Sequence, residues 1–453
     1  MAMNWSELLN PSRVGARPPK AEKGRSPFNS DHDKIIFSGA FRRLARKTQV
    51  HPLATNDHIH NRLTHSLEVA CVGRSLGILA GLKLEEKSKL PPEVCATDIG
   101  DIVQSTCLAH DIGNPPFGHT GEEAIKSWFS GEGSSFLSNM TPREANDLRN
   151  FEGNAQGLRV LTSVENHIND GGMRLTYATL SSFIKYPWTS LPAQDGQRPK
   201  KNKYGVFTSE LDVFHEISNA VGLIRKEGDD WYCRHPLVHL MESADDFCYG
   251  ILDLEDGLEM GIISWDELYD ILKPVLPPES ATELENEMSK LSFGRRTPLL
   301  RGKIIGSYVE AASEAFIKHE EQYLSGDPTV LIDLCEENVR GSILEAKDIA
   351  KKKIFVHPRK IELEVGSYNV ISTLLSVMCE SIYEWVNTPE KMSFRSKRIL
   401  DLIGESTFDP RIQSGETDLT KDYLALRRVI DFISGMTDNY ATFLAKQFNG
   451  MGI

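Results

Sequence analysis

Apolar residues recur at helical spacing through most of the chain, and stretches with the two-residue alternation of β-strands are scarce. The most regular amphipathic patterns cover residues 61–82, 96–112 and 236–258. Further helices are predicted, in chain order, over residues 265–292, 303–324, 327–353, 364–388, 394–404 and 419–448. Residues 354–368, IFVHPRKIELEVGSY, are expected to hold a short strand or an irregular turn. The pattern as a whole predicts an all-α protein with little or no strand.

We expect the chain to form three parts. Residues 1–30 are rich in Pro, Gly, Ser and basic residues, which favours an N-terminal arm. Residues 31–260 hold the strongest helical patterns and are expected to form the core, with a basic, Pro- and Gly-punctuated insertion near residues 186–206. Residues 261–453 are expected to form a helical C-terminal part that packs on this core.

Composition places the chain among ordinary globular proteins, with 40% hydrophobic and 25% charged residues in 453. No apolar stretch approaches the roughly 20 residues that a membrane-spanning helix needs, and the N-terminal sequence has no apolar signal region. The net charge of −13 argues against a protein that coats nucleic acid, although it leaves room for a local basic site. The seven cysteines are widely spaced and form no CxxC pair, which favours free thiols in a cytoplasmic protein.

Candidate chemistry is concentrated in residues 107–124, CLAHDIGNPPFGHTGEEA. An apolar helical run ends in the adjacent pair His110 and Asp111, where a metal ion could reach both side chains. A second histidine, His119, and a carboxylate, Glu122, follow after a rigid turn. The stretch is typical of the floor of a hydrolytic metal site.

Local signals place this stretch between two helices. Gly113 is a good residue for ending the first helix. Thr120 and Glu123 match a capping box, so the second helix is expected to begin at Thr120.

A complete metal site needs ligands from distant parts of the chain. His65 lies in the first turns of the predicted 61–82 helix, and together with His110 and Asp111 it would supply three ligands. The fourth is expected from residues 236–258, where Asp245 and Asp246 both have the right chemistry. Two nitrogen and two oxygen ligands would suit Mn, Mg, Fe, Ni or Zn.

Helical spacing favours Asp245 over its neighbour. Asp245, Tyr249 and Asp253 are four residues apart, so they share one face of the helix, beside its apolar stripe. That face would border a buried cleft. The simpler alternative is that Asp245 and Asp253 form part of a solvated helix surface.

Six segments resemble the HD-domain deoxynucleoside triphosphate triphosphohydrolases, and most closely the bacterial deoxyguanosine triphosphate triphosphohydrolase (dGTPase) group. They are FSGAFRRLARKTQV, HNRLTHSLEVACVGRSLG, LAHDIGNPPFGHTGEEAI, FEGNAQGLRVLT, MRLTYATLSSFIKYPW and LMESADDFCYGILDLED. They run in order between about residues 34 and 258, whereas residues 259–453 resemble the family only loosely, mainly at FVHPRKIELEVGSYNVISTLL.

The resemblance implies an all-α HD domain with appended helices and a metal-dependent enzyme. The implied reaction hydrolyses a deoxynucleoside triphosphate (dNTP), dGTP among others, to the deoxynucleoside and inorganic tripolyphosphate. The implied cofactor is a divalent ion, Mn²⁺ or Mg²⁺ before Fe, Ni, Co or Zn. The family also implies a homo-oligomer, because hexamers and tetramers occur in it.

The resemblance assigns roles residue by residue. The implied metal ligands are His65, His110, Asp111 and Asp245. The implied catalytic pair is His119 and Glu122. The positions that resemble substrate-binding residues are Gln49, Arg62, Tyr249 and Asp253, with Asn154, Lys185 and Tyr186 in pocket-lining segments.

These residue types fit the implied chemistry. A divalent ion would polarise the α-phosphate, and His119, oriented by Glu122, would assist the attack of water or protonate the departing 5′-oxygen. Because the substrate is anionic and the protein acidic, the pocket must be locally basic, with Arg62 and Lys185 as the expected cations. Tyr249 is expected to select deoxyribose by contact with the sugar.

Two basic stretches and two other functions remain open. The stretches from Arg198 to Lys203 and from Arg295 to Lys303 would bind a nucleotide or single-stranded DNA effector, or would simply be solvated. The alternative enzyme is another HD-type nucleotide phosphohydrolase or phosphodiesterase. The alternative outside catalysis is a nucleotide- or DNA-binding regulator with the same fold.

Overall fold

The protein is built almost entirely of helices, as the sequence pattern predicts. The structure, a computed structural model, describes residues 2–15, 24–49, 60–165, 171–191, 202–226, 230–404 and 408–452. Within these ranges the β-structure consists of isolated bridges, such as the one between Thr48 and Asn61, and there is no sheet. The all-α prediction is therefore confirmed.

Among the helices of the first 260 residues, α4 packs against α5 and α11. The α-helices are α1 (Trp5–Leu8), α2 (Pro27–Phe37), α3 (Gly39–Arg43), α4 (Arg62–Glu86), α5 (Ala96–Ala109), α6 (Gly118–Ser130), α7 (Pro142–Arg149), α8 (Gly153–Arg159), α9 (Tyr177–Phe183), α10 (Leu211–Ala220) and α11 (Leu237–Glu259). The short 3-10 and π turns are η1 (Leu44–Arg46), η2 (Glu132–Leu137), η3 (Val160–Val164) and η4 (Thr208–Glu210).

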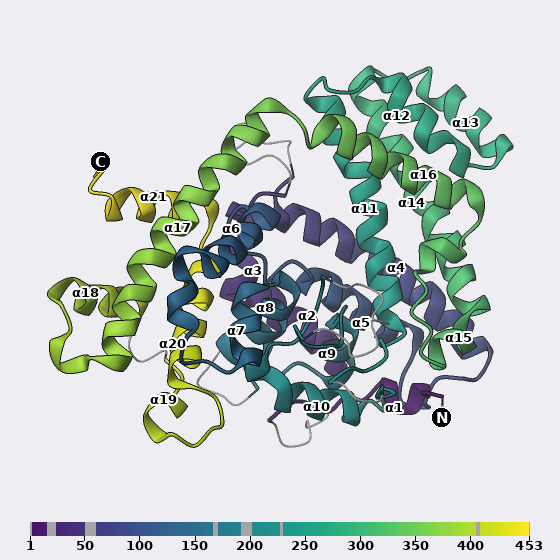
Figure 1. The fold of residues 1–453 in the computed structure, drawn as a ribbon. Coiled ribbons are helices and arrows are strands. Elements are labelled where there is room, and N and C mark those ends of the chain that lie inside the picture. Colours follow the sequence, from purple (N-terminus) through teal and green to yellow (C-terminus); the bar gives the residue numbers. More distant parts are fainter. Residues whose placement is uncertain are drawn as a thin grey trace.

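The remaining residues form two groups of helices on either side of the molecule (Figure 1). The first group contains α12 (Trp265–Leu272), η5 (Lys273–Val275), α13 (Pro278–Met288), α14 (Phe293–Lys318), α15 (Glu320–Leu324), η6 (Leu331–Leu334), α16 (Glu337–Ile349) and η7 (Ala350–Ile354). The second contains α17 (Pro358–Asn387), η8 (Pro389–Lys391), α18 (Phe394–Ile403), α19 (Arg411–Ser414), α20 (Lys421–Ser434) and α21 (Asp438–Phe448).

Of the two alternatives expected within residues 354–368, the structure has the irregular turn, at residues 355–357, and no strand. The turn is followed by α17, which begins at Pro358, a residue well suited to the first turn of a helix. A different local prediction is wrong. The helix expected from Thr120 begins two residues earlier, at Gly118. Its N-cap is Phe117, whose φ of 64° is left-handed and whose side chain gives no cap, so tertiary contacts override the capping-box signal.

Small residues bring α4 and α5 into close contact. A methyl group on Gly77 of α4 would lie 2.8 Å from the Cα atom of Gly100 in α5. At Gly73 it would lie 2.4 Å from the Sγ atom of Cys107. The backbones can approach this closely only because side chains are missing there. This seam fixes the start of α4 relative to the end of α5.

Two hydrophobic clusters form the interior. The first includes α4, α5, α11 and α14, with Val69, Leu76 and Phe247 fully buried. The second joins α6, α7 and α8 to α17, α20 and α21, so it includes side chains from both sides of residue 260. Figure 1 shows α17 lying along α6, with α20 and α21 beside it.

The first fifteen residues lie against the body of the protein. Trp5 of α1 is buried, and its Nε1 donates a hydrogen bond to Glu320 Oε1 at 2.8 Å. Residues 16–23 of the expected arm lie outside the described ranges. Among the described helices, none combines the length and the apolar character needed to cross a membrane.

Candidate active site

Three side chains from three separate helices converge on one point. His65, His110 and Asp245 each present a ligand atom, and these atoms all lie within 4.8 Å of one another. Asp245 Oδ1 lies 3.2 Å from His65 Nε2 and 3.6 Å from His110 Nε2. The fold therefore brings together side chains that are 45 to 180 positions apart in the sequence, at a spacing that suits one cation.

Local structure orients both imidazoles. His65 sits in the first turn of α4, which Asn61 caps through a reciprocal capping box with Thr64. His110 is the C-cap of α5, and its Nδ1 donates a hydrogen bond to the carbonyl of Cys107 at 2.6 Å. That bond places the His110 proton on Nδ1, so Nε2 keeps its lone pair for a metal ion.

Asp111 adjoins this cluster and has one carboxylate oxygen left over. Its Oδ1 accepts hydrogen bonds from Arg62 Nη1 at 2.7 Å and from Asn114 Nδ2 at 2.6 Å. Its Oδ2 is buried and has no hydrogen-bond partner among the described residues. An unpartnered buried carboxylate oxygen fits a site where a cation binds. The three converging groups and this oxygen thus provide the nitrogen and oxygen donors that a divalent ion accepts.

Asp245 and His65 influence each other's ionisation. Burial alone would raise the pKa of Asp245, but His110 and the hydrogen bond with His65 lower it well below its usual value. Burial alone would lower the pKa of His65, but Asp245 and other nearby carboxylates raise it above 6.5. In the absence of a cation, the raised pKa of His65 lets its imidazolium balance the buried Asp245 carboxylate.

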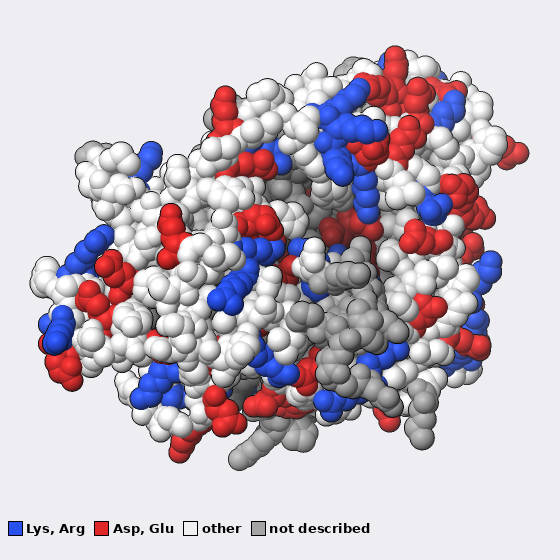
Figure 2. All heavy atoms as spheres, viewed as in Figure 1, with Lys and Arg blue, Asp and Glu red and all other residues white. Residues whose placement is uncertain are grey.

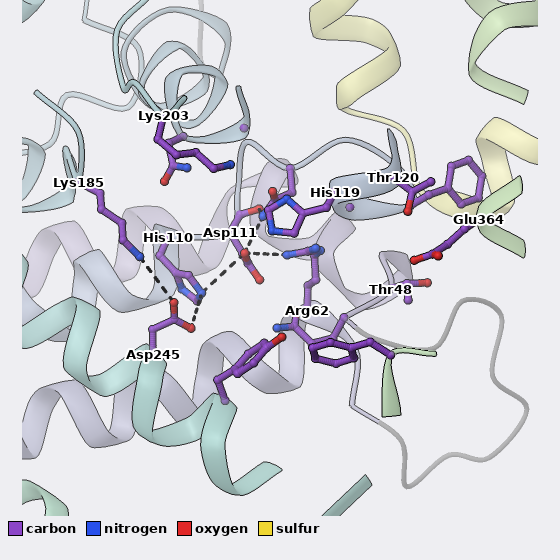
Figure 3. A pocket seen from close by; sticks show the side chains of 18 of the residues that line it. Thr48, Arg62, His110, Asp111, His119, Thr120, Lys185, Lys203, Asp245 and Glu364 are labelled. Atoms are coloured by element: carbon purple, nitrogen blue, oxygen red, sulfur yellow. Dashed lines mark hydrogen bonds and ion pairs between the residues drawn. The ribbon is translucent and has the colours of Figure 1, made fainter. Parts of the chain in front are cut away.

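A cavity of about 340 Å³ opens over these groups. That volume lies within the range of roughly 300–1,000 Å³ that small-molecule sites occupy. Figure 3 shows Lys185 and Asp245 at one end of the cavity, Arg62 and Asp111 in the middle, and Thr48 at the other end. Both hydrophobic clusters contribute to its walls, so the cavity lies where they meet.

His119 lines the cavity as the second residue of α6. Its side chain is 81% exposed, whereas that of its partner Glu122 is buried. His119 Nδ1 lies 3.1 Å from Glu122 Oε2, and Glu122 Oε1 accepts a hydrogen bond from Gly153 N at 2.8 Å. Burial would raise the pKa of Glu122, but the contacts with His119 and Lys203 lower it to about 2. A carboxylate held ionised in this way keeps the imidazole in one orientation.

Most of the side chains expected to contact substrate border the cavity. Those that line it are Gln49, Arg62, Asn154, Lys185, Tyr186 and Tyr249. Three residues of the expected site lie behind the wall instead, namely His65, Glu122 and Asp253.

Gln49 and Asp253 each have a buried side-chain oxygen that could form a hydrogen bond with a ligand. Gln49 Oε1 and Asp253 Oδ2 have no hydrogen-bond partner among the described residues. Burial and neighbouring carboxylates raise the pKa of Asp253 to about 8. Burial, with Asp253, also raises the pKa of the nearby Tyr249 hydroxyl, which therefore stays protonated. These groups offer hydrogen bonds to a ligand with hydroxyl groups.

Sequence reasoning missed several cavity residues. Lys203 was predicted only as part of a basic stretch that would bind an effector or be solvated, yet it lines the cavity and contacts Glu152 at 2.9 Å and Glu122 at 3.7 Å. Lys360 and Glu364 of α17 also line it and form an ion pair at 2.6 Å. The basic character of residues 198–203 was visible in the sequence, but nothing local linked α17 to the site.

The two basic stretches have different surroundings. Residues 198–201 lie outside the described ranges. The other stretch begins α14, and its Arg301 pairs with Glu255 of α11 at 2.6 Å. Figure 2 shows basic and acidic side chains interspersed over the visible face.

The chain is similar to described families over two segments. Residues 62–215 match the HD domain, and residues 335–447 match the phosphohydrolase-associated domain. The α4, α5 and α6 side chains of the candidate site lie in the first segment, and α17 lies in the second.

Relatives match over nearly the whole chain. A "deoxyguanosinetriphosphate triphosphohydrolase-like protein" of Pseudomonas aeruginosa (strain LESB58) is 46% identical over 455 residues, 99% of each chain. A protein of the same name from Synechocystis sp. is 37% identical over 462 residues, 100% of each chain. A "deoxyguanosinetriphosphate triphosphohydrolase" of Yersinia pestis (strain Pestoides F) is 31% identical over 507 residues, 97% of each chain.

Proposed function

Since the chain belongs to the family of HD-domain deoxyguanosinetriphosphate triphosphohydrolases and similar proteins, we propose that it hydrolyses a dNTP, with dGTP as the first candidate, to the deoxynucleoside and inorganic tripolyphosphate. Family membership by itself makes the protein a phosphohydrolase that acts on nucleotides. The finer proposal rests on one observation: a cluster of metal-ligating side chains and an exposed, carboxylate-oriented imidazole border the same cavity.

The proposed metal ligands are His65, His110, Asp111 and Asp245. Their donor atoms fit a divalent ion, because two imidazole nitrogens and carboxylate oxygens meet there and one buried oxygen lacks a partner among the described residues. When bound, such an ion would act as a Lewis acid toward a phosphate oxygen. Mn²⁺ or Mg²⁺ is the first candidate, and Fe, Ni, Co or Zn would fit the same donors.

The cavity is suited to a triphosphate. Among the described residues, four basic side chains border it, and Arg62, Lys185 and Lys203 lie on the side of the metal ligands and His119. Nearby carboxylates raise the pKa of Lys185, against the effect of burial, and those around Lys203 do the same. Both lysines therefore remain cationic at neutral pH and would bind phosphate oxygens. The N-terminus of α6 adds a favourable dipole for an anion.

His119 would transfer the proton. Its Nδ1 is engaged by Glu122, which leaves Nε2 as the nitrogen available to a reactant. Water would attack the α-phosphorus while the bond to the 5′-oxygen breaks. The imidazole would either assist the attack or protonate the departing oxygen. Glu122 holds the ring in one orientation.

The sugar would lie near Gln49 and Tyr249. Gln49 Oε1 can accept a hydrogen bond from a sugar hydroxyl, and Tyr249 would pack against C2′. Asp253, which carries a proton at neutral pH, would support Tyr249 from behind. A site built to receive one hydroxyl and to exclude another discriminates between sugars more strongly than an apolar wall does.

One experiment tests the proposal. Purified protein is incubated with each of the four dNTPs and Mn²⁺, and the products are separated by anion-exchange chromatography. Inorganic tripolyphosphate with the free deoxynucleoside is the expected result. Release of orthophosphate, pyrophosphate or a nucleoside monophosphate would indicate another HD-type phosphohydrolase instead, and no turnover of any dNTP would favour a binding protein.

Assembly and regulation are further parts of the proposal. Exposed apolar side chains on α17, Ile361, Val365 and Tyr368, support self-association as a homo-oligomer. The basic start of α14 would bind a nucleotide or single-stranded DNA effector. Light scattering and titration of activity with single-stranded DNA at two salt concentrations measure these properties separately.

A further inference from the structure

One carboxylate from the end of the chain holds two backbone segments that border the cavity. Asp438 is the first residue of α21, and only 2% of it is exposed. Its Oδ2 accepts hydrogen bonds from the N–H of Thr48, at 3.0 Å, and from the Thr48 hydroxyl. Its Oδ1 accepts a hydrogen bond from the N–H of Phe117 at 2.9 Å. Three donors from two distant segments thus meet on a single side chain.

Each of these segments carries a group of the proposed site. Thr48 immediately precedes Gln49, and it forms a β-bridge with Asn61, the N-cap of α4. Phe117 is the N-cap of α6 and has a left-handed backbone, two residues before His119. Because both segments bond to the same carboxylate, Asp438 fixes the distance between Gln49 and His119.

A second contact ties the same part of the chain to the turn after Asp111. The ammonium of Lys47 is buried and donates hydrogen bonds to the carbonyls of Asn114 and Ser434, each at 2.5 Å. Asn114 in turn donates to Asp111. Ser434 ends α20, so both C-terminal helices contact the backbone of the site through polar groups.

The Asp438 carboxylate is not needed to cap its own helix. Thr437 is the N-cap of α21, and its side chain accepts the hydrogen bond from Tyr440 N. A charged acceptor that makes three hydrogen bonds in a buried place is therefore directed wholly at the cavity segments. An amide would present an NH₂ group to one of the same donors, so no neutral side chain of this shape satisfies all three.

We propose that Asp438 is a positioning residue of the active site, and this inference rests on the proposed function. It holds the Gln49 segment and the His119 turn at a fixed distance. Gln49 can then contact the sugar of a substrate molecule while His119 contacts the reacting phosphate end of the same molecule. The phosphohydrolase-associated segment then completes the catalytic geometry through polar contacts rather than only covering the HD domain.

The test compares Asp438→Asn and Thr48→Val with a matched control. Asp422→Asn changes the corresponding first-turn acid of α20, which contacts only Asn139 and Asn387 among the contacts described for it. For Asp438→Asn we expect kcat/KM to fall by about 10- to 100-fold, since a displacement near 1 Å can reduce turnover to that extent. Bound metal per chain and the unfolding temperature should stay close to those of the wild type. The control should keep wild-type kinetics.

A double-mutant cycle separates positioning from a general loss of structure. Thr48→Val removes only the hydroxyl donor, so it should reduce kcat/KM less than Asp438→Asn does. If both act through one contact, the double variant should lose less than the product of the two single effects. Hydrogen exchange should rise at the amides of residues 48 and 117 and stay unchanged in α5. Multiplicative effects, or wild-type kinetics per folded molecule in Asp438→Asn, would overturn the inference.

The two proposals can fail separately. If the wild type hydrolyses no dNTP, the proposed function fails, and hydrogen exchange still reports whether Asp438 holds the two segments. If the wild type is active and exchange at residues 48 and 117 does not change in Asp438→Asn, the positioning inference alone is wrong.

Discussion

In the proposed mechanism, His119 is the reactive group and Glu122 is the group that orients it. The imidazole is open to the cavity, whereas the carboxylate is buried and accepts a backbone hydrogen bond from Gly153. The exposed imidazole can therefore reach a ligand in the cavity, while the buried carboxylate of Glu122 keeps its negative charge. This division suits a general acid or base whose orientation must persist between turnovers.

Replacing His119 by Ala should abolish turnover and leave the metal bound. The imidazole is not part of the ligand cluster, so the ligand atoms of His65, His110 and Asp245 remain in place. Loss of a general acid–base group reduces kcat by about 10²- to 10⁴-fold. Steady-state kinetics and metal analysis of the dialysed protein check both expectations. Activity near that of the wild type would remove His119 from the mechanism.

Replacing Lys203 by Ala should mainly weaken substrate binding. Lys203 lines the cavity and stays cationic beside Glu122 and Glu152, so it offers a charge to the triphosphate. Loss of one charge-assisted contact, worth about 1.5–3 kcal/mol, should raise KM by roughly one to two orders of magnitude. Lys421→Ala, at an exposed position of α20, is the control. An unchanged KM for every dNTP would show that Lys203 only balances the two glutamates.

The turn between α5 and α6 is positioned by contact with α8 as much as by its own sequence. A methyl group on Gly113 would lie 2.0 Å from the carbonyl oxygen of Gly153 and 2.1 Å from the N atom of Gly157. Both neighbours are backbone, which cannot move without shifting α8. The turn that carries His110 and Asp111 at one end and His119 at the other therefore rests directly on a second helix.

Gly113→Ala should lower both stability and metal affinity. Overpacking against backbone costs about 1–3 kcal/mol or more, and relief of the clash would displace Asp111. Gly306→Ala is the matched control, because its methyl group would meet nothing within 4 Å among the described residues of the structure. Because Gly306 lies in the middle of α14, its replacement by alanine should stabilise the protein by up to about 1 kcal/mol. Urea unfolding and metal titration measure both effects, and equal behaviour of the two variants would contradict the packing argument.

The sequence was sufficient where periodicity and local chemistry agree. The patterns over residues 61–82, 96–112 and 236–258 correspond to α4, α5 and α11, so the helices that carry the histidines and Asp245 were placed within a few residues. The start of α6 was misplaced because Phe117 adopts a left-handed backbone held by Asp438, a contact 321 positions away. Lys360 and Glu364 lie in the C-terminal stretch that resembles the family, but periodicity and local chemistry did not indicate that they border the cavity, because tertiary packing brings α17 to the site.

The cavity lies between the two hydrophobic clusters, so helices from both the N-terminal and the C-terminal parts of the chain position its lining residues. The helices that carry His65, His110 and Asp245 pack in the first cluster. The helix that follows the His119 turn packs in the second. Polar contacts such as Arg159 with Asp431, at 2.8 Å, join HD-domain helices to α20. Activity should therefore depend on the docking of the two clusters as well as on each one's own stability.

Two buried neutral histidines make a contribution to stability that should be lost below about pH 6.5. Burial lowers the pKa of His239 to about 3 and that of His235 to about 4. His239 stacks on Tyr323 with ring centroids 4.1 Å apart, and its Nδ1 has no partner among the described residues. In the unfolded chain each of these histidines takes up a proton near pH 6.5. In the folded chain the same histidine becomes protonated only at a much lower pH. This contribution to stability is thus complete above pH 6.5. Below that pH it is lost by about 1.4 kcal/mol per pH unit for each histidine.

His239→Phe should remove one such contribution. Phenylalanine retains the stacking on Tyr323 and takes up no proton in either state. Between pH 7.5 and 5.0 the free energy of unfolding should fall by about 2 kcal/mol less in the variant than in the wild type, as measured by urea titration. His319→Phe, at a partly exposed histidine, is the control and should retain the wild-type pH dependence. If His239→Phe also retained it, protonation of His239 in the unfolded chain would not contribute to the acid sensitivity of the fold.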